Sequence, residues 1–388
     1  MKLKQLPEDF QVEERTDVRA GVEGPFAFYR MEKRGWSTPD ALAAVRRRWK
    51  IDLRRLSYGG LKDRHACSVQ YLTIFHGPRR RLHHQGVTVE YLGQVATPYT
   101  SRDIRANAFR LALRDLEPSS QAGIDRALEE IRRQGVPNYY DDQRFGSVSA
   151  DHEFIAKHLV FGRFEEALRL ALASHYEHDR APQKKEKAIL NRHWNDWKQC
   201  KAELPRGHAR SLVDYLVSHP TDFRGAMARM RPELKGLYLS AYQSYLWNRM
   251  LARWLNTHCL PEQLMTVPLR LGEVPMHRGL EEPVFQQLAG LSLPLPSART
   301  KLEPGDPRVE LVQAVLAAEG LEMSGMKVKG VRELFFSRGE RTALCLPAEL
   351  EFEWGEDEKH SGKLKLTLSF ELARGSYATL LVKRLASA

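Results

Sequence analysis

The spacing of hydrophobic residues predicts an α+β arrangement for about the first 135 residues. Apolar and β-branched residues gather there in short β-rich runs, at 68–75, 87–95 and 108–113. A helical spacing occurs at 38–49, where Thr38 is the predicted N-cap, and again from Ser119 or Ser120 to Gly135. Strands and helices therefore alternate irregularly in this part of the chain.

From about residue 149 the helical spacing dominates. It recurs in four segments, at 154–159, 164–173, 239–255 and 307–320. Strand-like patterns return only near the end of the chain, at 364–372 and 377–382. Their return predicts one α+β domain that is interrupted by a mostly helical insertion.

The length agrees with that division, because 388 residues correspond to about 2.6 ordinary domains. We place the split α+β domain at residues 1–134 together with 346–388, and the insertion at 135–345. Hydrophobic residues make up 42% and charged residues 28%, values typical of a folded globular chain.

The charge balance changes the picture, because 60 Lys and Arg outnumber 49 Asp and Glu and give a net charge of +11. Such an excess points to a polyanionic partner, with nucleic acid ahead of an anionic membrane surface. Candidate phosphate contacts are Arg46–Arg48, Arg79–Arg81 and the polar stretch 184–210. That stretch also contains Trp194 and Trp197, so it is either a solvated helix face with two anchoring tryptophans or an RNA-facing surface.

The cysteine spacing and the apolar segments indicate which cellular compartment the sequence favours and which structural modules it lacks. The four cysteines form no CxxC pair, which predicts neither a disulfide framework nor a cysteine-based zinc module. The charged N-terminus is unlike a signal peptide, and the uncharged stretch 283–298 contains three prolines that no bilayer span would carry. We therefore expect a cytoplasmic protein without a membrane segment.

Metal and nucleotide motifs are weak or missing. His152 and His158 lie six residues apart rather than the four that place two ligands on one helical face. We expect no metal site there, and a metal-dependent hydrolase built on these histidines and Glu153 is the weakest of three interpretations. No Walker A, GxGxxG or GxSxG pattern occurs in the sequence.

Two segments carry candidate chemistry. In Tyr58–Ala66 a glycine turn sets Asp63 between Lys62 and Arg64, and neighbouring cations favour the ionised form of a carboxylate. In Gly135–Gly146, aromatic and amide groups of the kind that hold bases are concentrated. Taken singly, each segment is also compatible with an ordinary surface turn.

Together these segments resemble the TruD family of RNA pseudouridine synthases. Seven motifs occur in the family's order along nearly the whole chain: Pro7–Glu14, Glu32–Gly35 with Thr38, Gly60–Ala66 with Gln70, Asn107–Phe109, Pro137–Gly146, Ser240–Ser244 and Gly375–Thr379. Seven ordered matches are far more specific than any one of them.

The resemblance implies a pseudouridine-synthase catalytic domain with a mixed, mainly antiparallel sheet, into which the family inserts a mostly helical domain. It makes Asp63 the catalytic aspartate. It places Phe10, Asn107, Phe109 and Tyr377 around the target uridine, with Lys62, Arg64 and Arg144 close by. The implied partner is tRNA, modified at uridine 13 of the D arm by a monomer that needs no cofactor or metal.

Three positions depart from the family pattern. Tyr140-Asp141 stands where the family usually has Phe-Gly, which adds a hydroxyl and a negative charge near RNA. Gly24-Pro25-Phe26 replaces a segment that often contains His, and Ser37 replaces an Asn before Thr38. None of these changes touches the Asp63 motif.

The implied reaction breaks the N1–C1′ bond of uridine, turns the uracil and joins C5 to C1′, so mass and redox state do not change. Attack of Asp63 on C1′, attack on C6 and assistance of glycal formation are all open. The target base must leave its stack, and aromatic faces would hold it. The alternative is a non-catalytic RNA-binding or tRNA-folding protein on the same scaffold.

Overall fold

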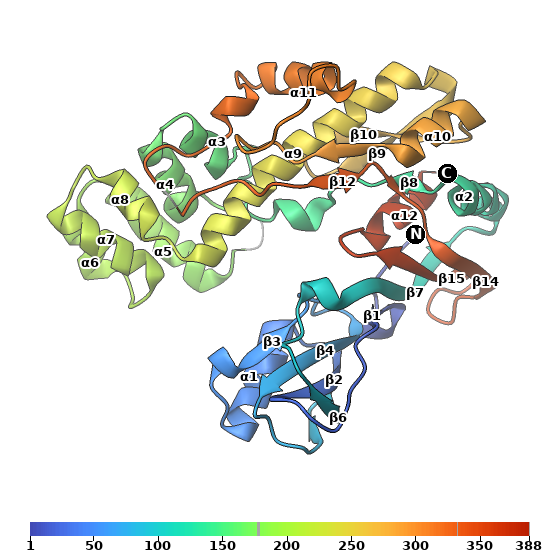
Figure 1. Cartoon of the computed structure of the whole chain (residues 1–388), viewed down its shortest axis with the longest axis horizontal. Helices are drawn as coiled ribbons and strands as arrows, with labels where there is room; N and C mark the ends of the chain where they lie inside the picture. The colour runs from blue at the N-terminus through green and yellow to red at the C-terminus, as the bar shows by residue number, and fades with distance from the viewer. Residues whose placement is uncertain (177–178, 332, 388) are drawn as a thin grey trace. The chain divides into compact units, whose positions relative to one another are not determined.

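A computed structural model describes residues 1–176, 179–331 and 333–387. The chain folds as two compact units (Figure 1). The first unit consists of Met1–Val136 and Cys345–Ala388, and the second of Pro137–Leu344. The assignment of these units as a catalytic domain and an inserted domain stays a prediction.

The first unit is built on a sheet that contains nine strands within the described residues, in the order β14-β15-β7-β1-β4-β2-β6-β5, with β3 beside β4. The strands are β1 (Phe10–Thr16), β2 (Phe26–Arg34), β3 (Leu56–Tyr58), β4 (Cys67–Phe75), β5 (Leu82–His84), β6 (Val87–Val95), β7 (Ile104–Leu116), β14 (Ala348–Glu356) and β15 (Leu364–Ala373). Neighbouring strands are antiparallel except β1 and β4, which are parallel. The predicted α+β class with a mixed, mainly antiparallel sheet is confirmed.

The register of the central strands decides which side chains share a face. β1 pairs with β7 so that Phe10 lies opposite Leu111 and Glu14 opposite Asn107. Residues paired across antiparallel strands point to the same side of a sheet. The side that carries Phe10, Glu14, Asn107 and Phe109 is called the site face below.

Helices cover both ends of the site face. Ala41, Leu42 and Val45 of α1 (Thr38–Trp49) form a core with Met31 of β2 and Leu72 of β4. At the other end α2 (Gln121–Gln134) is fixed to β14, because the Trp354 indole N–H donates to Asp125 Oδ1 and Arg132 donates to the Leu350 carbonyl. The middle of the face, over β1 and β7, lies between them.

The strand predicted at residues 377–382 is wrong, because Tyr377 is the N-cap of helix α12 (Ala378–Ala386) and residues 378–382 belong to that helix. Leu380 and Leu381 are both buried, which the alternation of a strand would not allow on a half-exposed element. In the helix, Leu381 and Leu385 stand four residues apart on the face that is buried. Tyr377 and Val382 gave the strand-like signal, and packing against α2 overrides it.

The predicted N-cap of α1 is also wrong by one residue. Ser37 caps the helix by accepting a hydrogen bond from the Asp40 N–H, and Thr38 is the first helical residue. The Thr38 hydroxyl does not cap the helix and donates instead to Gln70 Oε1.

The second unit is mostly helical. Its helices are α3 (Ile155–Val160), α4 (Phe164–Ala173), α5 (Ala181–Arg192), α6 (Trp197–Glu203), α7 (His208–Ser218), α8 (Phe223–Ala228), α9 (Pro232–His258), α10 (Glu282–Gly290) and α11 (Arg308–Ala317). Short strands accompany them: β9 (Leu264–Leu269) pairs with β10 (Gly272–His277), and β11 (Ser292–Pro294) pairs with β12 (Glu340–Thr342). Strands β8 (Val136–Pro137) and β13 (Leu344–Cys345) pair where the chain passes between the units.

The two tryptophans of the basic stretch are anchors. Trp197 is buried and its indole N–H donates to the Pro220 carbonyl, while that of Trp194 donates to Glu165 Oε1. Their indoles therefore fix α5 and α6 within the second unit, whereas Lys184 and other lysines there stay exposed. Among the helices of the described residues, none combines the length and apolarity that crossing a bilayer requires.

Candidate active site

The loop that carries Asp63 lies between β3 and β4, and the side chain of Lys33 on β2 binds its backbone. The Lys33 side chain is only 2% exposed. Its ammonium donates to the backbone carbonyls of Trp36 at 2.7 Å, Asp63 at 2.8 Å and Lys62 at 3.3 Å. Burial lowers the pKa of Lys33 to about 8, although the nearby Asp63 charge partly opposes this shift. One ammonium group thus links the backbone at Trp36 to the backbone at Lys62 and Asp63.

Thr38 and Gln70 hold the same loop from a second side. The Thr38 hydroxyl accepts from the Lys62 N–H at 2.9 Å and donates to Gln70 Oε1 at 2.7 Å. The Gln70 amide in turn donates to the Gly60 carbonyl at 2.7 Å. The motif residues Lys33, Thr38 and Gln70 therefore share one structural task, which is to fix the backbone of residues 60–63.

The Asp63 carboxylate is half-exposed and forms an ion pair with Lys4. The Lys4 Nζ lies 2.5 Å from Asp63 Oδ2 and 4.1 Å from the centre of the Phe10 ring. The N-terminal segment that presents Lys4 is itself anchored, because Lys2 forms backbone hydrogen bonds with Arg114 of β7. The buried Arg114 guanidinium also donates to Asp9 Oδ1 at 2.9 Å. Sequence reasoning missed Lys4, which stands outside the matched motifs.

A second ion pair, which is buried, lies beside this one on the site face. The Lys62 Nζ is 3.3 Å from Glu14 Oε1, and it donates to Asn107 Oδ1 at 2.5 Å. Glu14 is fully buried, and its other oxygen accepts from the Tyr71 N–H and the Tyr99 hydroxyl. Burial lowers the pKa of Lys62, and the Glu14 charge partly restores it. Glu14 belongs to a matched motif, but the sequence assigned it no role.

Aromatic rings line the same face next to these charges. The Phe10 and Phe109 rings meet edge to face with centroids 6.0 Å apart, and Phe109 stacks on Phe370 at 5.5 Å. Edge-to-face and offset stacking orient rings without a rigid hydrogen bond. The predicted residues Phe10, Lys62, Asn107 and Phe109 are thus brought together, with Asp63 next to Phe10 through Lys4.

The remaining predicted residues are Tyr377, Arg64 and Arg144. Tyr377 is half-buried at the N-cap of α12, and Arg64 is exposed next to Asp63 in the loop. Arg144 belongs to the second unit, in the 3-10 helix η5 (Asp142–Phe145), where its Nε donates to Ser244 Oγ of α9 at 3.0 Å. Two of the matched motifs of the second unit, 137–146 and 240–244, therefore contact each other.

The departure at Tyr140-Asp141 affects the interior of the second unit. Tyr140 and Asp141 are 8% and 2% exposed, so the added hydroxyl and charge do not form an open surface. The Tyr140 N–H donates to Asn248 Oδ1, and the Arg341 guanidinium lies 4.2 Å from the Tyr140 ring centre. The expected hydroxyl and negative charge therefore lie inside the second unit and not on its surface.

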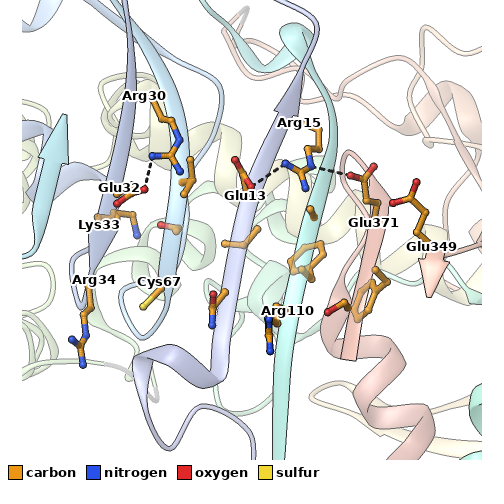
Figure 2. A pocket seen from close by; sticks show the side chains of 18 of the residues that line it. Glu13, Arg15, Arg30, Glu32, Lys33, Arg34, Cys67, Arg110, Glu349 and Glu371 are labelled. Carbon is orange, nitrogen blue, oxygen red and sulfur yellow. Dashed lines mark hydrogen bonds and ion pairs between the residues drawn. The ribbon is translucent and has the colours of Figure 1, made fainter. Parts of the chain in front are cut away.

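A groove of about 820 Å³ lies on the opposite side of the sheet (Figure 2). Glu13 and Arg15 line it, and they alternate along β1 with the site-face residues Phe10 and Glu14. Arg15 forms ion pairs with Glu13 and Glu371, both at 2.9 Å, as the dashed lines in Figure 2 show. The charges of this face largely neutralise one another, so the groove differs in character from the Asp63 site.

Within residues 1–176, 179–331 and 333–387, no group of three or more His, Cys, Asp or Glu side chains is placed to hold a metal ion. His158 contacts Glu153 at 3.4 Å, as a pair. The four cysteines are free thiols.

A buried lysine that clamps the loop, an ion-paired aspartate and stacked aromatic rings therefore lie close together at the site face. The model of the family "tRNA pseudouridine synthase D (TruD)" matches residues 1–385, and the chain therefore belongs to the TruD family of tRNA pseudouridine synthases.

Relatives cover almost the whole chain. "Probable tRNA pseudouridine synthase D 2" of Methanocaldococcus jannaschii is 31% identical, over 99% of this chain and 91% of the relative. "tRNA pseudouridine synthase D" of Aquifex aeolicus is 27% identical, over 99% of this chain and 98% of the relative. The crystal structure of the "Putative tRNA pseudouridine synthase D (TruD)" from Methanosarcina mazei superposes with a TM-score of 0.73 at 26% identity, covering 100% of this chain and 93% of that one.

Proposed function

We propose that this protein converts uridine 13 in the D arm of tRNA to pseudouridine, with Asp63 as its catalytic aspartate. Membership of the TruD family supports the reaction and the tRNA substrate. The choice of position 13 rests on the resemblance of the motifs. The single observation that carries the assignment of Asp63 is that its loop is clamped by three motif residues directly beside the Phe10, Lys62 and Asn107 side chains.

The chemistry of the site fits the reaction. Loss of the N1–C1′ bond leaves an electron-poor sugar carbon, which a fixed carboxylate can stabilise or bond. The Lys4 ammonium lies 2.5 Å from Asp63 Oδ2 and holds the carboxylate in an ion pair. After C5 has bonded to C1′, a base must remove the C5 proton and N1 must gain a proton, so that pseudouridine is released with no change in mass. A target base that has left its stack would rest against Phe10, Phe109 and Tyr377.

Polar and charged residues complete the proposed substrate contacts. Asn107 and Lys62 would face the base, Arg64 would contact RNA next to Asp63, and Arg144 would contact RNA from the second unit. Residues 1–134 with 346–388 would form the catalytic domain, and residues 135–345 the inserted one. We further propose that the protein acts in the cytoplasm and that it is a monomer. Light scattering of the purified protein at micromolar concentration would test the oligomeric state.

The decisive experiment compares wild type with Asp63→Asn on an unmodified tRNA transcript. Wild type should form pseudouridine at position 13, and Asp63→Asn should bind the transcript with unchanged affinity and form none. Asp17→Asn, with an 86% exposed side chain in the same unit, is the matched control and should keep full activity.

A second transcript in which uridine 13 is replaced by cytidine tests the position. The product should disappear with that change alone. If wild type binds tRNA but modifies no uridine under single-turnover conditions, the protein is an RNA-binding factor and the catalytic proposal fails.

A further inference from the structure

The buried Glu14 carboxylate lies next to Lys62 and Asn107 on the site face. Glu14 on β1 and Asn107 on β7 are directly paired across the two strands. Its Oε2 is fixed by the Tyr71 N–H at 3.1 Å and the Tyr99 hydroxyl at 3.4 Å. Its Oε1 is left facing the Lys62 ammonium at 3.3 Å. Glu14 is fully buried, so it cannot itself touch an RNA.

Lys62 bridges the two paired residues. Its side chain is 12% exposed, and its ammonium reaches both Glu14 Oε1 and Asn107 Oδ1. Removing a buried partner leaves a lysine charge uncompensated, which is strongly unfavourable. Without Glu14, the Lys62 ammonium would therefore be expected to turn away from this position.

The bridge decides which way the Asn107 amide points. An ammonium group can only donate hydrogen bonds, so it must meet the amide oxygen and not the amide nitrogen. The Asn107 Nδ2 group then points away from Lys62, and within the described residues it makes no hydrogen bond of its own. Asn107 presents two N–H donors on the site face.

A donor at this point distinguishes the two pyrimidines. Uracil carries a carbonyl acceptor at C4, where cytosine carries an amine donor. We propose that Glu14 acts through Lys62 as a positioning residue, orienting the Asn107 amide so that its Nδ2–H donates to O4 of the target uridine and the site rejects cytidine. This proposal rests on the proposed function, since it concerns the base in the same site.

The test compares transcripts that carry uridine, 4-thiouridine or 2-thiouridine at the target position. Sulfur is the poorer acceptor, so wild type should form product about 10- to 100-fold more slowly on 4-thiouridine than on uridine. On 2-thiouridine its rate should stay within about threefold of the uridine rate, because O2 is not the proposed contact. Product is measured in single turnovers by chromatography of the digested nucleosides.

Glu14→Gln and Lys62→Met should both be slower on uridine, and their uridine to 4-thiouridine rate ratio should fall to within about threefold of one. The ratio is independent of the fraction of folded enzyme, so a merely structural role would leave it at the wild-type value. Glu13→Gln changes the neighbouring carboxylate on the opposite side of the sheet and should keep the wild-type ratio.

Two results would overturn the proposal: a wild-type rate that is the same on 4-thiouridine and uridine, or a wild-type ratio in both Glu14→Gln and Lys62→Met. Failure of the proposed function looks different, because wild type would then form no pseudouridine on the unsubstituted transcript. The comparison of the two thio-substituted transcripts needs only wild type, so it tests the contact with O4 even if one variant does not fold, and the other variant then tests the positioning role.

Discussion

Lys33→Met tests whether one buried ammonium keeps the Asp63 loop in its reactive position. Methionine keeps most of the length and packing of the lysine but removes all three donors to the carbonyls of Trp36, Lys62 and Asp63. A buried acceptor left without its partner costs about 1–3 kcal/mol. Two of the three hydrogen bonds are short, but water can reach part of the loop and replace some of them. We therefore expect the free energy that favours the ordered loop over disordered ones to fall by about 2–3 kcal/mol. If only the ordered loop reacts, the rate falls by about 30- to 160-fold.

The pH dependence of the same contact has a distinctive sign. Burial lowers the pKa of Lys33 to about 8, below its usual value of 10.5, with Asp63, Lys62 and Cys67 as the nearby charges. Above about pH 8 the neutral amine donates more weakly, so the rate should fall. Between about pH 8 and 10.5 the unfolded chain binds more protons at this position than the folded chain, so the contribution of Lys33 to the free energy of unfolding rises with pH. The rate and this stability contribution therefore change in opposite directions.

Single-turnover pseudouridine formation at saturating tRNA measures the rate, and circular dichroism checks the fold. Lys359→Met removes an exposed lysine of the same unit and should leave the rate unchanged. The affinity for tRNA should not change in Lys33→Met, because Lys33 is buried. A folded Lys33→Met protein whose rate stays within threefold of wild type, with the same fall above pH 8, would refute the reasoning.

Three further changes have defined outcomes. Lys4→Met removes the cation 2.5 Å from the Asp63 carboxylate and should slow product formation at least about tenfold with unchanged tRNA binding; a wild-type rate would contradict this. Leu381→Ala should lower the free energy of unfolding by about 2–5 kcal/mol in urea titrations, since Leu381 is buried on α12, and a change below about 1 kcal/mol would argue against that packing. Arg144→Ala should weaken tRNA binding and reduce the slope of log affinity against log salt by about one, and an unchanged slope would exclude a phosphate contact.

Elements with strong local signals could be predicted from the sequence. The predicted segments 38–49, 164–173 and 87–95 are helices α1 and α4 and strand β6. These predictions succeeded because the hydrophobic spacing and the residues that end each element lie within the segment itself. Strands β1 and β2 were not predicted, since charged residues interrupt their alternation. Their identity as strands depends on neighbours distant in sequence, as the error at 377–382 also shows.

The sequence by itself determined the family, through the order of seven motifs, and it singled out Asp63 as the candidate catalytic residue. Only the tertiary structure decided what surrounds that carboxylate. Lys4 reaches it from 59 residues away, and Glu14 meets Asn107 through the register of β1 on β7. Strand pairing of this kind is set by long-range packing of whole faces, and no local pattern encodes which polar residues it will place in contact.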